Sequence, residues 1–198
     1  MFLTGRQILT KEDLENWQHD TEKFMSNNPK LKEAMLDPSR IFNQDETAVE
    51  IGSSSQRVLA EVNTDILYTI SGGSREHITA SYLTSADGCL VPPRLIYKGV
   101  RNMAMKHLKD LPKTGQSGEW TFSVSEKGYI TRDIFVLVCK DLDQFLTLKK
   151  IPRPVILLLD GCSPHISLEA AAFCKEKGIQ PWLFKPNMTH LLQGSFQI

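Results

Sequence analysis

Two aspartates in this chain follow short apolar runs, at positions where strands are expected to end. Asp160 closes the run Pro154–Leu159 and is followed by Gly161, and Asp45 follows Ile41–Gln44. The run before Asp160 is typical of a strand buried on both faces, and open α/β sheets place their chemistry just outside the carboxyl ends of such strands. Proteins hold Mg²⁺ with one or two carboxylates together with substrate phosphate. The two aspartates therefore predict a metal site if their strands are neighbours, although each alone is equally a turn residue.

Two other side chains near Asp160 have types that can do chemistry. His165 lies five residues after Asp160. It either contacts substrate or tunes the carboxylate, but the interpretation favoured by sequence alone is a loop histidine that bonds to nearby backbone. Cys162 is interpreted as a partly buried bystander, because the sequence places no base to activate its thiol.

Positive charge gathers between residues 92 and 115, which makes this segment the best local candidate for contacts with phosphate. The segment carries six basic side chains against the single acid Asp110: Arg94, Lys98, Arg101, Lys106, Lys109 and Lys113. A solvated, lysine-rich loop explains the segment equally well, since few aromatic side chains accompany the charges.

The elements that must position these residues follow from apolar periodicity and from turn signals. Helices are predicted over residues 11–26 behind a capping box at 10–13, over 31–36, after the N-cap Thr131, and over 168–177 between Ser167 and Gly178. The helix after Thr131 carries one apolar face: Ile134, Phe135, Val138, Leu142 and Phe145.

Strands are predicted over residues 41–44, 66–70, 77–83, 89–91, 95–97, 154–159 and 180–184. In the strand 77–83, Ile78, Ala80 and Tyr82 share one face, and Pro92–Pro93 lies at an edge or a bulge. Residues 50–63 and 99–127 are predicted to be loops. An antiparallel block, a helix and then β-α-β give an α/β protein: a mixed sheet of antiparallel meander and parallel strands flanked by helices, as in RNase H-like folds.

The composition is that of one soluble globular domain. Its 198 residues are 41% hydrophobic, and 23 basic side chains balance 23 acidic ones, so no global positive field indicates a nucleic-acid partner. The four cysteines form no CxxC pair, and neither a secretory signal nor a stretch of transmembrane length is present. We expect a soluble protein of a reducing intracellular compartment.

Five ordered motifs give the chain a resemblance to a known family. They are SRIFNQDET, PPRLIYKG, GYITRDIF, VILLLDGCSPHIS and PNMTHLLQ. In this order they resemble the DDE transposase domain of the pogo, Tigger and jerky group, which is related to the transposase-derived region of centromere protein B. The resemblance runs from about residue 10 to residue 193. It divides the chain into a helical lead-in, residues 1–40, and a DDE transposase-like catalytic-core domain, residues 41–198.

The resemblance implies an RNase H-like core in which three acids bind two Mg²⁺ or Mn²⁺ ions. Such ions activate water or a DNA 3′-hydroxyl for in-line attack on a phosphodiester. Asp45 matches the first acid, Asp160 the second, and His165 the histidine commonly found after the second acid. We count His165 with the six basic side chains as a candidate nucleic-acid contact. The implied partner is DNA in the nucleus, with a homo-oligomer possible and neither a membrane nor a small-molecule substrate involved.

The third acid of the family is missing from its expected place. In the family, the segment that PNMTHLLQ resembles continues to an aspartate, whereas here Phe196 stands at that position and no acid follows Glu176. We expect a domain that is truncated at its C-terminus, catalytically impaired and without the family's N-terminal pair of helix-turn-helix units. The alternatives are a domesticated, non-enzymatic scaffold that binds DNA or protein, and a fragment that does not fold stably.

Overall fold

The computed structural model describes residues 10–51, 76–99 and 120–184, and these are the residues discussed below. Their elements follow one another in the order α1 (Lys11–Ser26), α2 (Pro29–Met35), η1 (Pro38–Arg40), β1 (Ile41–Ile51), β2 (Glu76–Ser85), β3 (Leu90–Lys98), β4 (Thr121–Ser125), α3 (Arg132–Leu148), β5 (Val155–Leu159), η3 (Ser163–His165), α4 (Leu168–Lys177) and β6 (Ile179–Leu183).

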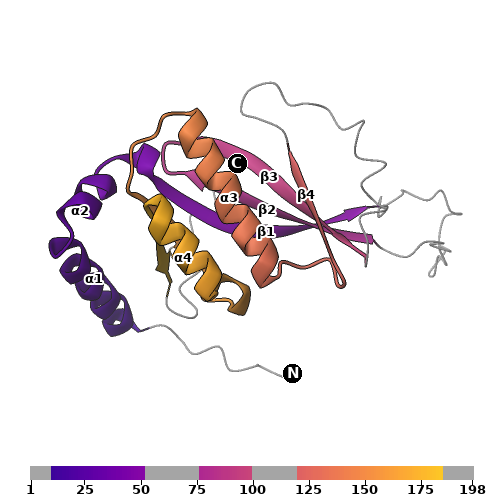
Figure 1. The fold of residues 1–198 in the computed structure, drawn as a ribbon. Helices are drawn as coiled ribbons and strands as arrows, with labels where there is room; N and C mark the ends of the chain where they lie inside the picture. Colours follow the sequence, from indigo (N-terminus) through magenta and orange to yellow (C-terminus); the bar gives the residue numbers. More distant parts are fainter. Residues whose placement is uncertain (1–9, 52–75, 100–119, 185–198) are drawn as a thin grey trace, which may run out of the picture.

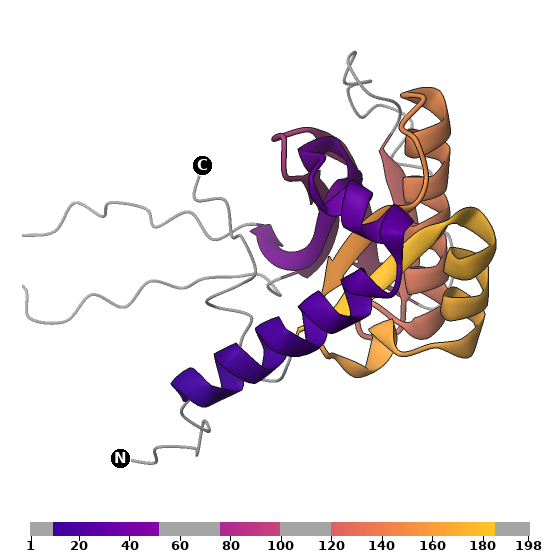
Figure 2. The same ribbon diagram turned by 90° about the vertical axis from the view of Figure 1, so that its left-hand side faces the viewer.

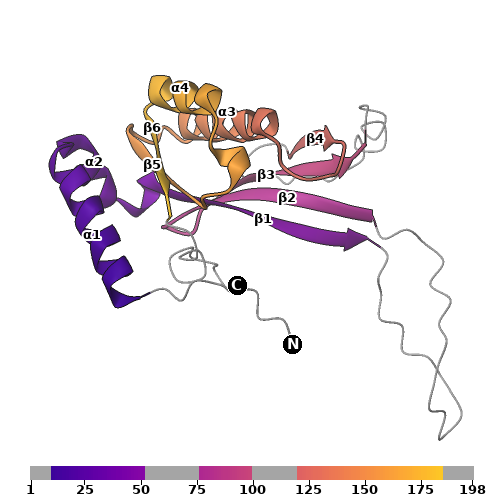
Figure 3. The same cartoon turned by 90° about the horizontal axis from the view of Figure 1, so that it is seen from below.

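The described strands form one six-stranded mixed sheet in the order β4-β3-β2-β1-β5-β6 (Figures 1 and 3). β1 pairs antiparallel with β2 on one side and parallel with β5 on the other. β2 and β3 continue the antiparallel part, while β6 runs parallel to β5 and β4 runs parallel to β3. β1 is therefore the strand that joins the antiparallel part of the sheet, β1 to β3, to the parallel pair β5 and β6.

Helices cover both faces of the sheet (Figure 2). α3 and α4 pack on one face, where they share a hydrophobic core with the strands: Phe42, Leu83, Val91, Phe135, Val138, Leu142, Leu157 and Leu159 are among its buried members. α1 and α2 lie on the opposite face, where a smaller cluster joins Leu31 and Ala34 to Ile156 of β5. The strand β5 is consequently buried from both sides, which accounts for its uninterrupted aliphatic sequence.

α3 forms where the apolar period predicts a helix. The Thr131 side chain accepts a hydrogen bond from the Ile134 amide and caps the N-terminus. Leu142, at the centre of the buried face, has no exposed surface. The predicted apolar face of this helix is confirmed, since all five of its residues are buried.

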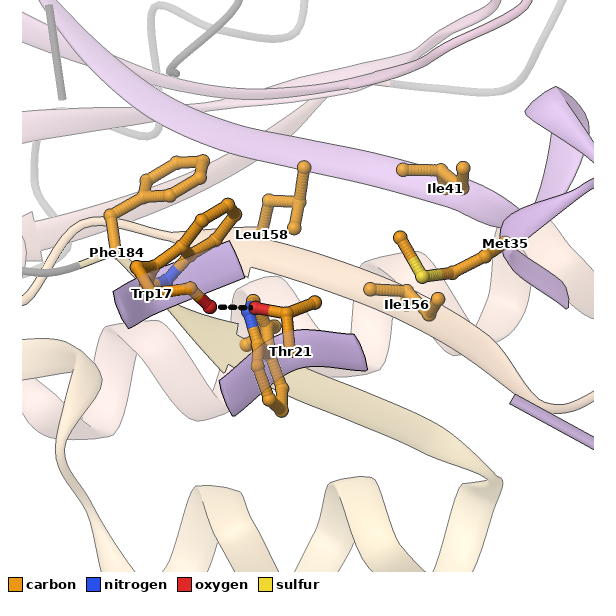
Figure 4. Close-up of a pocket in the computed structure, with 8 residues that line it drawn as sticks. Trp17, Thr21, Met35, Ile41, Ile156, Leu158 and Phe184 are labelled. Carbon is orange, nitrogen blue, oxygen red and sulfur yellow. Dashed lines mark hydrogen bonds between the residues drawn. The ribbon is translucent and has the colours of Figure 1, made fainter. Parts of the chain in front are cut away.

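α1 rests on the sheet across an apolar pocket of about 130 Å³ (Figure 4). Trp17 contacts Phe184 with ring centroids 6.3 Å apart, and the Thr21 hydroxyl donates a 2.7 Å hydrogen bond to the Trp17 carbonyl. The other lining residues are Met35, Ile41, Ile156, Leu158 and Trp182. This lining holds no charged side chain, so the pocket serves packing rather than acid–base chemistry.

The four predicted helices are confirmed within the described residues, and so is the predicted capping box. Thr10 and Asp13 exchange hydrogen bonds: the Thr10 amide donates to Asp13 at 3.0 Å and the Asp13 amide to Thr10 at 3.2 Å. Gly178 ends α4 in the left-handed conformation, at φ 66°, as its place behind the helix predicts.

The predicted strand boundaries are wrong in three places. β1 continues to Ile51 rather than ending near Gln44, because β2 pairs with it from Phe42 to Ile51. Residues 121–125, predicted to be part of a loop, form β4 beside β3. β3 runs unbroken through Pro92–Pro93. The register of its pairing with β2 shifts opposite these prolines, between Ser81 and Leu83, which confirms the predicted bulge. The alternative, an edge position, is wrong, because β3 lies between β4 and β2.

The predicted strand 77–83 is confirmed as part of β2, so Ile78, Ala80 and Tyr82 share one face of it. Thr79, Ser81 and Leu83, on the other face, are the more deeply buried side chains, whereas Ala80 and Tyr82 are only partly buried. The strand predicted at 66–70 and most of the loop predicted at 50–63 lie outside the described residues.

Candidate metal site

Asp45 lies in β1, and Asp160 directly follows the neighbouring parallel strand β5. β1 and β5 pair in the register Ile41↔Ile156 to Asn43↔Leu158, and two further residues along each chain lead to the two aspartates. Asp160 directly follows the last residue of β5. The condition set by the sequence, that the two strands be neighbours in one sheet, is met.

Asp45 lies inside β1 rather than at its end, which corrects the sequence prediction. The strand continues against β2, where Asp45 is paired with Tyr82. The Tyr82 hydroxyl donates a 3.1 Å hydrogen bond to Asp45 Oδ2. Asp45 is therefore held on a rigid strand and oriented by the neighbouring one.

The pKa of Asp45 reflects mainly its burial. Burial raises the pKa of Asp45, and the nearby carboxylates of Glu46 and Asp160 add to this in smaller measure, against the hydrogen bonds from the Glu46 amide and Tyr82 that lower it. Burial of a carboxylate disfavours its charged form, and a bound cation would favour that form.

His165 lies between two carboxylates. Its Nδ1 is 2.6 Å from Asp160 Oδ1, and its Nε2 is 3.1 Å from Glu46 Oε1. The short helix η3 turns the chain back so that this side chain is only 2% exposed. The imidazole ring also packs on Phe135 of α3, with centroids 4.6 Å apart.

The ionisation of Asp160 and His165 is shifted by this contact. Burial acts to lower the pKa of His165, but hydrogen bonds and charges from Asp160 and Glu46 outweigh burial and raise it to about 9. The hydrogen bond from His165 is the largest cause that lowers the pKa of Asp160 to about 2. Asp160 is thus a carboxylate, and His165 a cation, at neutral pH.

Cys162 stays a thiol beside this pair. Burial, followed by the neighbouring Asp160 and Glu46 carboxylates, raises its pKa to about 12. Potential ligand atoms of Glu46, Cys162 and His165 lie within 4.8 Å of one another. Both ring nitrogens of His165 are, however, already engaged by carboxylates. The three side chains are therefore better described as a hydrogen-bonded group than as a set of free ligands.

Glu46 is the site residue that sequence reasoning missed. It follows Asp45 directly, and the signal that could have found it is the alternation of a β-strand, which directs consecutive side chains to opposite faces. Once β1 is known to continue past Gln44, Asp45 and Glu46 must face different sides of the sheet. Glu46 then lies on the same face as Phe42, the face that carries α3.

The oxygen-rich pair Asp45 and Asp160 fits a hard divalent ion. Carboxylates are preferred ligands of Mg²⁺, and Mg²⁺ sites commonly rest on only one or two of them. The Asp160 side chain is 32% exposed, which leaves it open to an ion and to its water ligands. Burial, which raises the pKa of Asp45, leaves this carboxylate with little solvent to stabilise its charge, and a bound ion would supply that stabilisation.

The predicted nucleic-acid contacts are only partly within the described residues. Arg94 is 8% exposed, and its guanidinium donates two 2.8 Å hydrogen bonds to the Asp141 carboxylate. Lys98 is exposed at the end of β3. Arg94 and His165 are themselves buried and paired with carboxylates, which favours structural roles, while contact with nucleic acid stays a prediction for both residues and for Lys98. Four further candidates lie outside the described residues: Arg101, Lys106, Lys109 and Lys113.

Comparison with solved structures shows the fold. The Mos1 strand transfer complex is 12% identical, with a TM-score of 0.55 over 99% of this chain and 49% of the Mos1 chain. The Mos1 transposase catalytic domain with Raltegravir and Mn is 11% identical, with a TM-score of 0.50 over 96% of this chain and 70% of that one. This chain thus spans about half the length of the Mos1 chain in the strand transfer complex. The predicted RNase H-like α/β fold is confirmed.

No helix among the described residues has both the length and the apolar character needed to cross a membrane. The sequence profile of the DDE superfamily endonucleases matches residues 76–197, more than half of the chain. That match includes Asp160, and the fold brings Asp45 to its side. The chain belongs to the DDE superfamily endonuclease family.

Proposed function

We propose that Asp45 and Asp160 hold a divalent metal ion, Mg²⁺ or Mn²⁺, in a domain of the pogo, Tigger and jerky group that acts on DNA phosphodiesters in the nucleus. The observation that carries this proposal is that β1, which bears Asp45, pairs in parallel with β5, whose last residue directly precedes Asp160. Membership in the DDE superfamily endonuclease family supports the reaction class. One Mos1 catalytic-domain structure is described with Mn, which supports the choice of ion.

When bound, such an ion activates water or a DNA 3′-hydroxyl and stabilises the attacking and leaving oxygens of an in-line displacement. The chain's own side chains have simpler tasks. Asp45 presents its carboxylate from a strand interior, and the Tyr82 hydroxyl orients it through the 3.1 Å hydrogen bond. Asp160 remains ionised because His165 holds its pKa near 2. DNA would contact the basic segment between residues 92 and 115 that the sequence predicts.

We further propose that this 198-residue chain, assayed on its own, cleaves DNA poorly. The resemblance implies three acids, and Phe196 stands at the position where the third is expected. With two carboxylates, an ion keeps fewer protein ligands, and the stabilisation of charge in the transition state is weakened. The same observation favours a second candidate function: a DNA-binding scaffold that retains the fold without cleaving.

A nicking assay on supercoiled plasmid, in Mg²⁺ and in Mn²⁺, tests this proposal. We expect salt-sensitive DNA binding with at most weak nicking, stronger in Mn²⁺, that Asp160→Ala abolishes. Glu126→Gln is the matched control, because Glu126 is an exposed acid in the turn after β4, at the far edge of the sheet.

Each outcome of the nicking assay separates the candidates. Efficient nicking in Mg²⁺ that Asp160→Ala abolishes would contradict the proposed impairment. Nicking that Asp160→Ala leaves unchanged would contradict the assignment of the site. DNA binding that persists in a metal chelator, weakens with salt and is never accompanied by nicking favours the scaffold.

A further inference from the structure

The alignment of Asp45 with Asp160 is not fixed by backbone pairing between their strands. The described pairing of β1 with β5 ends at Asn43↔Leu158, two residues before the aspartates. Asp160 already belongs to the turn that leads into η3. Metal sites depend on ligand placement within fractions of an ångström, so some other contact must set the position of this carboxylate.

His165 supplies that contact by linking β1 to the end of β5. Its Nε2 lies 3.1 Å from Glu46 Oε1, and its Nδ1 lies 2.6 Å from Asp160 Oδ1. Glu46 is the residue next to Asp45 on the same strand. The hydrogen-bonded series Glu46–His165–Asp160 therefore links Asp160 to β1, the strand that carries Asp45.

The imidazole ring is itself held firmly. The side chain of His165 is 2% exposed and packs on Phe135, and the His165 amide donates a 3.1 Å hydrogen bond to the Cys162 carbonyl. Both ring nitrogens face carboxylate oxygens, and both can donate only when the ring is doubly protonated. Charge-assisted hydrogen bonds of this kind are shorter and stronger than neutral ones.

Further contacts restrain the carboxylate of Asp160. The Cys162 amide donates a 3.2 Å hydrogen bond to Oδ1, the oxygen that also faces His165. The Cys162 side chain also forms a hydrogen bond with this carboxylate. With Oδ1 held from two sides, the orientation of the carboxylate depends on His165 and on the turn that follows β5.

We propose that Glu46 and His165 are positioning residues of the metal site, which fix Asp160 at the distance and orientation from Asp45 that a divalent ion requires. This inference rests on the metal site proposed for Asp45 and Asp160. Partners that orient ligand side chains commonly change metal affinity by about 10- to 100-fold when they are removed.

Two substitutions at Glu46 separate positioning from charge. Glu46→Gln removes the charge but keeps an oxygen that accepts the Nε2 hydrogen bond, whereas Glu46→Ala removes both. The affinity for Mn²⁺ is measured from the electron paramagnetic resonance signal of the free ion. We expect Glu46→Gln to bind within about threefold of the unsubstituted chain and Glu46→Ala to bind about 10- to 100-fold more weakly.

Asp141→Asn is the matched control, because it breaks another well-buried ion pair, the one with Arg94 on β3, two strands from β1. We expect it to lower thermal stability without changing Mn²⁺ affinity. The imidazole N–H proton resonances add a readout that needs no metal: both should be visible in the unsubstituted chain, and Glu46→Ala should remove the one from Nε2–H.

The outcomes are distinguishable. If the unsubstituted chain binds Mn²⁺ and Glu46→Ala only lowers stability, as Asp141→Asn does, the positioning role is wrong while the metal site stands. Equal weakening by Glu46→Gln and Glu46→Ala would assign the effect to charge and overturn positioning. Failure of the folded, unsubstituted chain to bind Mn²⁺ would overturn the metal site and the positioning role with it.

Discussion

At the scale of single residues, the two adjacent acids of β1 have different tasks. Asp45 is the proposed metal ligand, and Glu46 faces the other side of the sheet, where it bonds to His165. The alternation of a strand produces this division without any change in residue type. Asp45 thus interacts with Asp160 through charge, whereas Glu46 is linked to Asp160 through the imidazole of His165.

The buried His165 should make stability depend on pH. Its pKa is about 9 in the folded chain and 6.5 ordinarily, so its stabilising contribution is complete below pH 6.5 and is lost as the pH rises through about 9. Each tenfold change in an acid equilibrium is about 1.4 kcal/mol, so the loss is on the order of a few kcal/mol. Urea unfolding in a metal chelator, between pH 6 and pH 9.5, measures it.

His165→Gln is the reference for this pH series, because glutamine cannot carry the charge. Its free energy of unfolding should be lower at pH 6 and should change much less between pH 6 and pH 9.5. A parallel decline in both proteins would contradict an imidazolium between Glu46 and Asp160. The contribution of Asp160 to stability has the opposite pH dependence: it is present above pH 3.8 and is lost as the pH falls towards 2.

At the scale of elements, local patterns predicted the helices well and the strands less well. The spacing of Ile134, Val138 and Leu142 identifies a helical face by itself, since a helix satisfies its own backbone. The backbone groups of a strand bond to a neighbouring strand, so the extension of β1 to Ile51 depends on β2 and could not be predicted from the sequence of β1 alone. β4 was missed for the same reason, because it exists through its pairing with β3.

The candidate site shows the same limit. Asp45 and Asp160 could be selected because each follows an apolar strand signal in the sequence. His165 and Glu46, which are joined by a hydrogen bond, are 119 residues apart in the sequence. No local sequence pattern indicates a contact over that separation, so the sequence favoured a loop histidine that bonds to nearby backbone. That contact appears only when η3 folds back against β1.

α3 should be the element whose core face matters most for stability. Leu142 has no exposed surface, and Leu142→Ala should lower the free energy of unfolding by about 2–5 kcal/mol through lost burial and a cavity. Leu148→Ala is the control on the same helix, because Leu148 is 66% exposed, and its effect should stay within about 0.5 kcal/mol. Chemical denaturation measures both, and equal effects would contradict the packing of α3 on the sheet.

At the scale of the whole molecule, the fold explains why chemistry and packing are separated. α3 and α4 stabilise one face of the sheet, α1 and α2 cover β5 on the other, and β1 continues beyond the end of β5 (Figure 3). The balance of 23 basic and 23 acidic side chains gives no overall attraction for DNA. The proposed contact with DNA would therefore depend on local charge, such as the predicted basic segment between residues 92 and 115.

The central claim is that one divalent ion lies between Asp45 and Asp160, and metal-directed cleavage of the polypeptide tests it most directly. Fe²⁺ in place of Mg²⁺, with ascorbate and peroxide, generates hydroxyl radicals that cut the chain close to the bound ion. We predict cuts near residues 45 and 160, which excess Mg²⁺ suppresses and the Asp45→Asn, Asp160→Asn double variant lacks. The absence of cuts at both places in the folded chain, or their persistence in the double variant, would contradict the account.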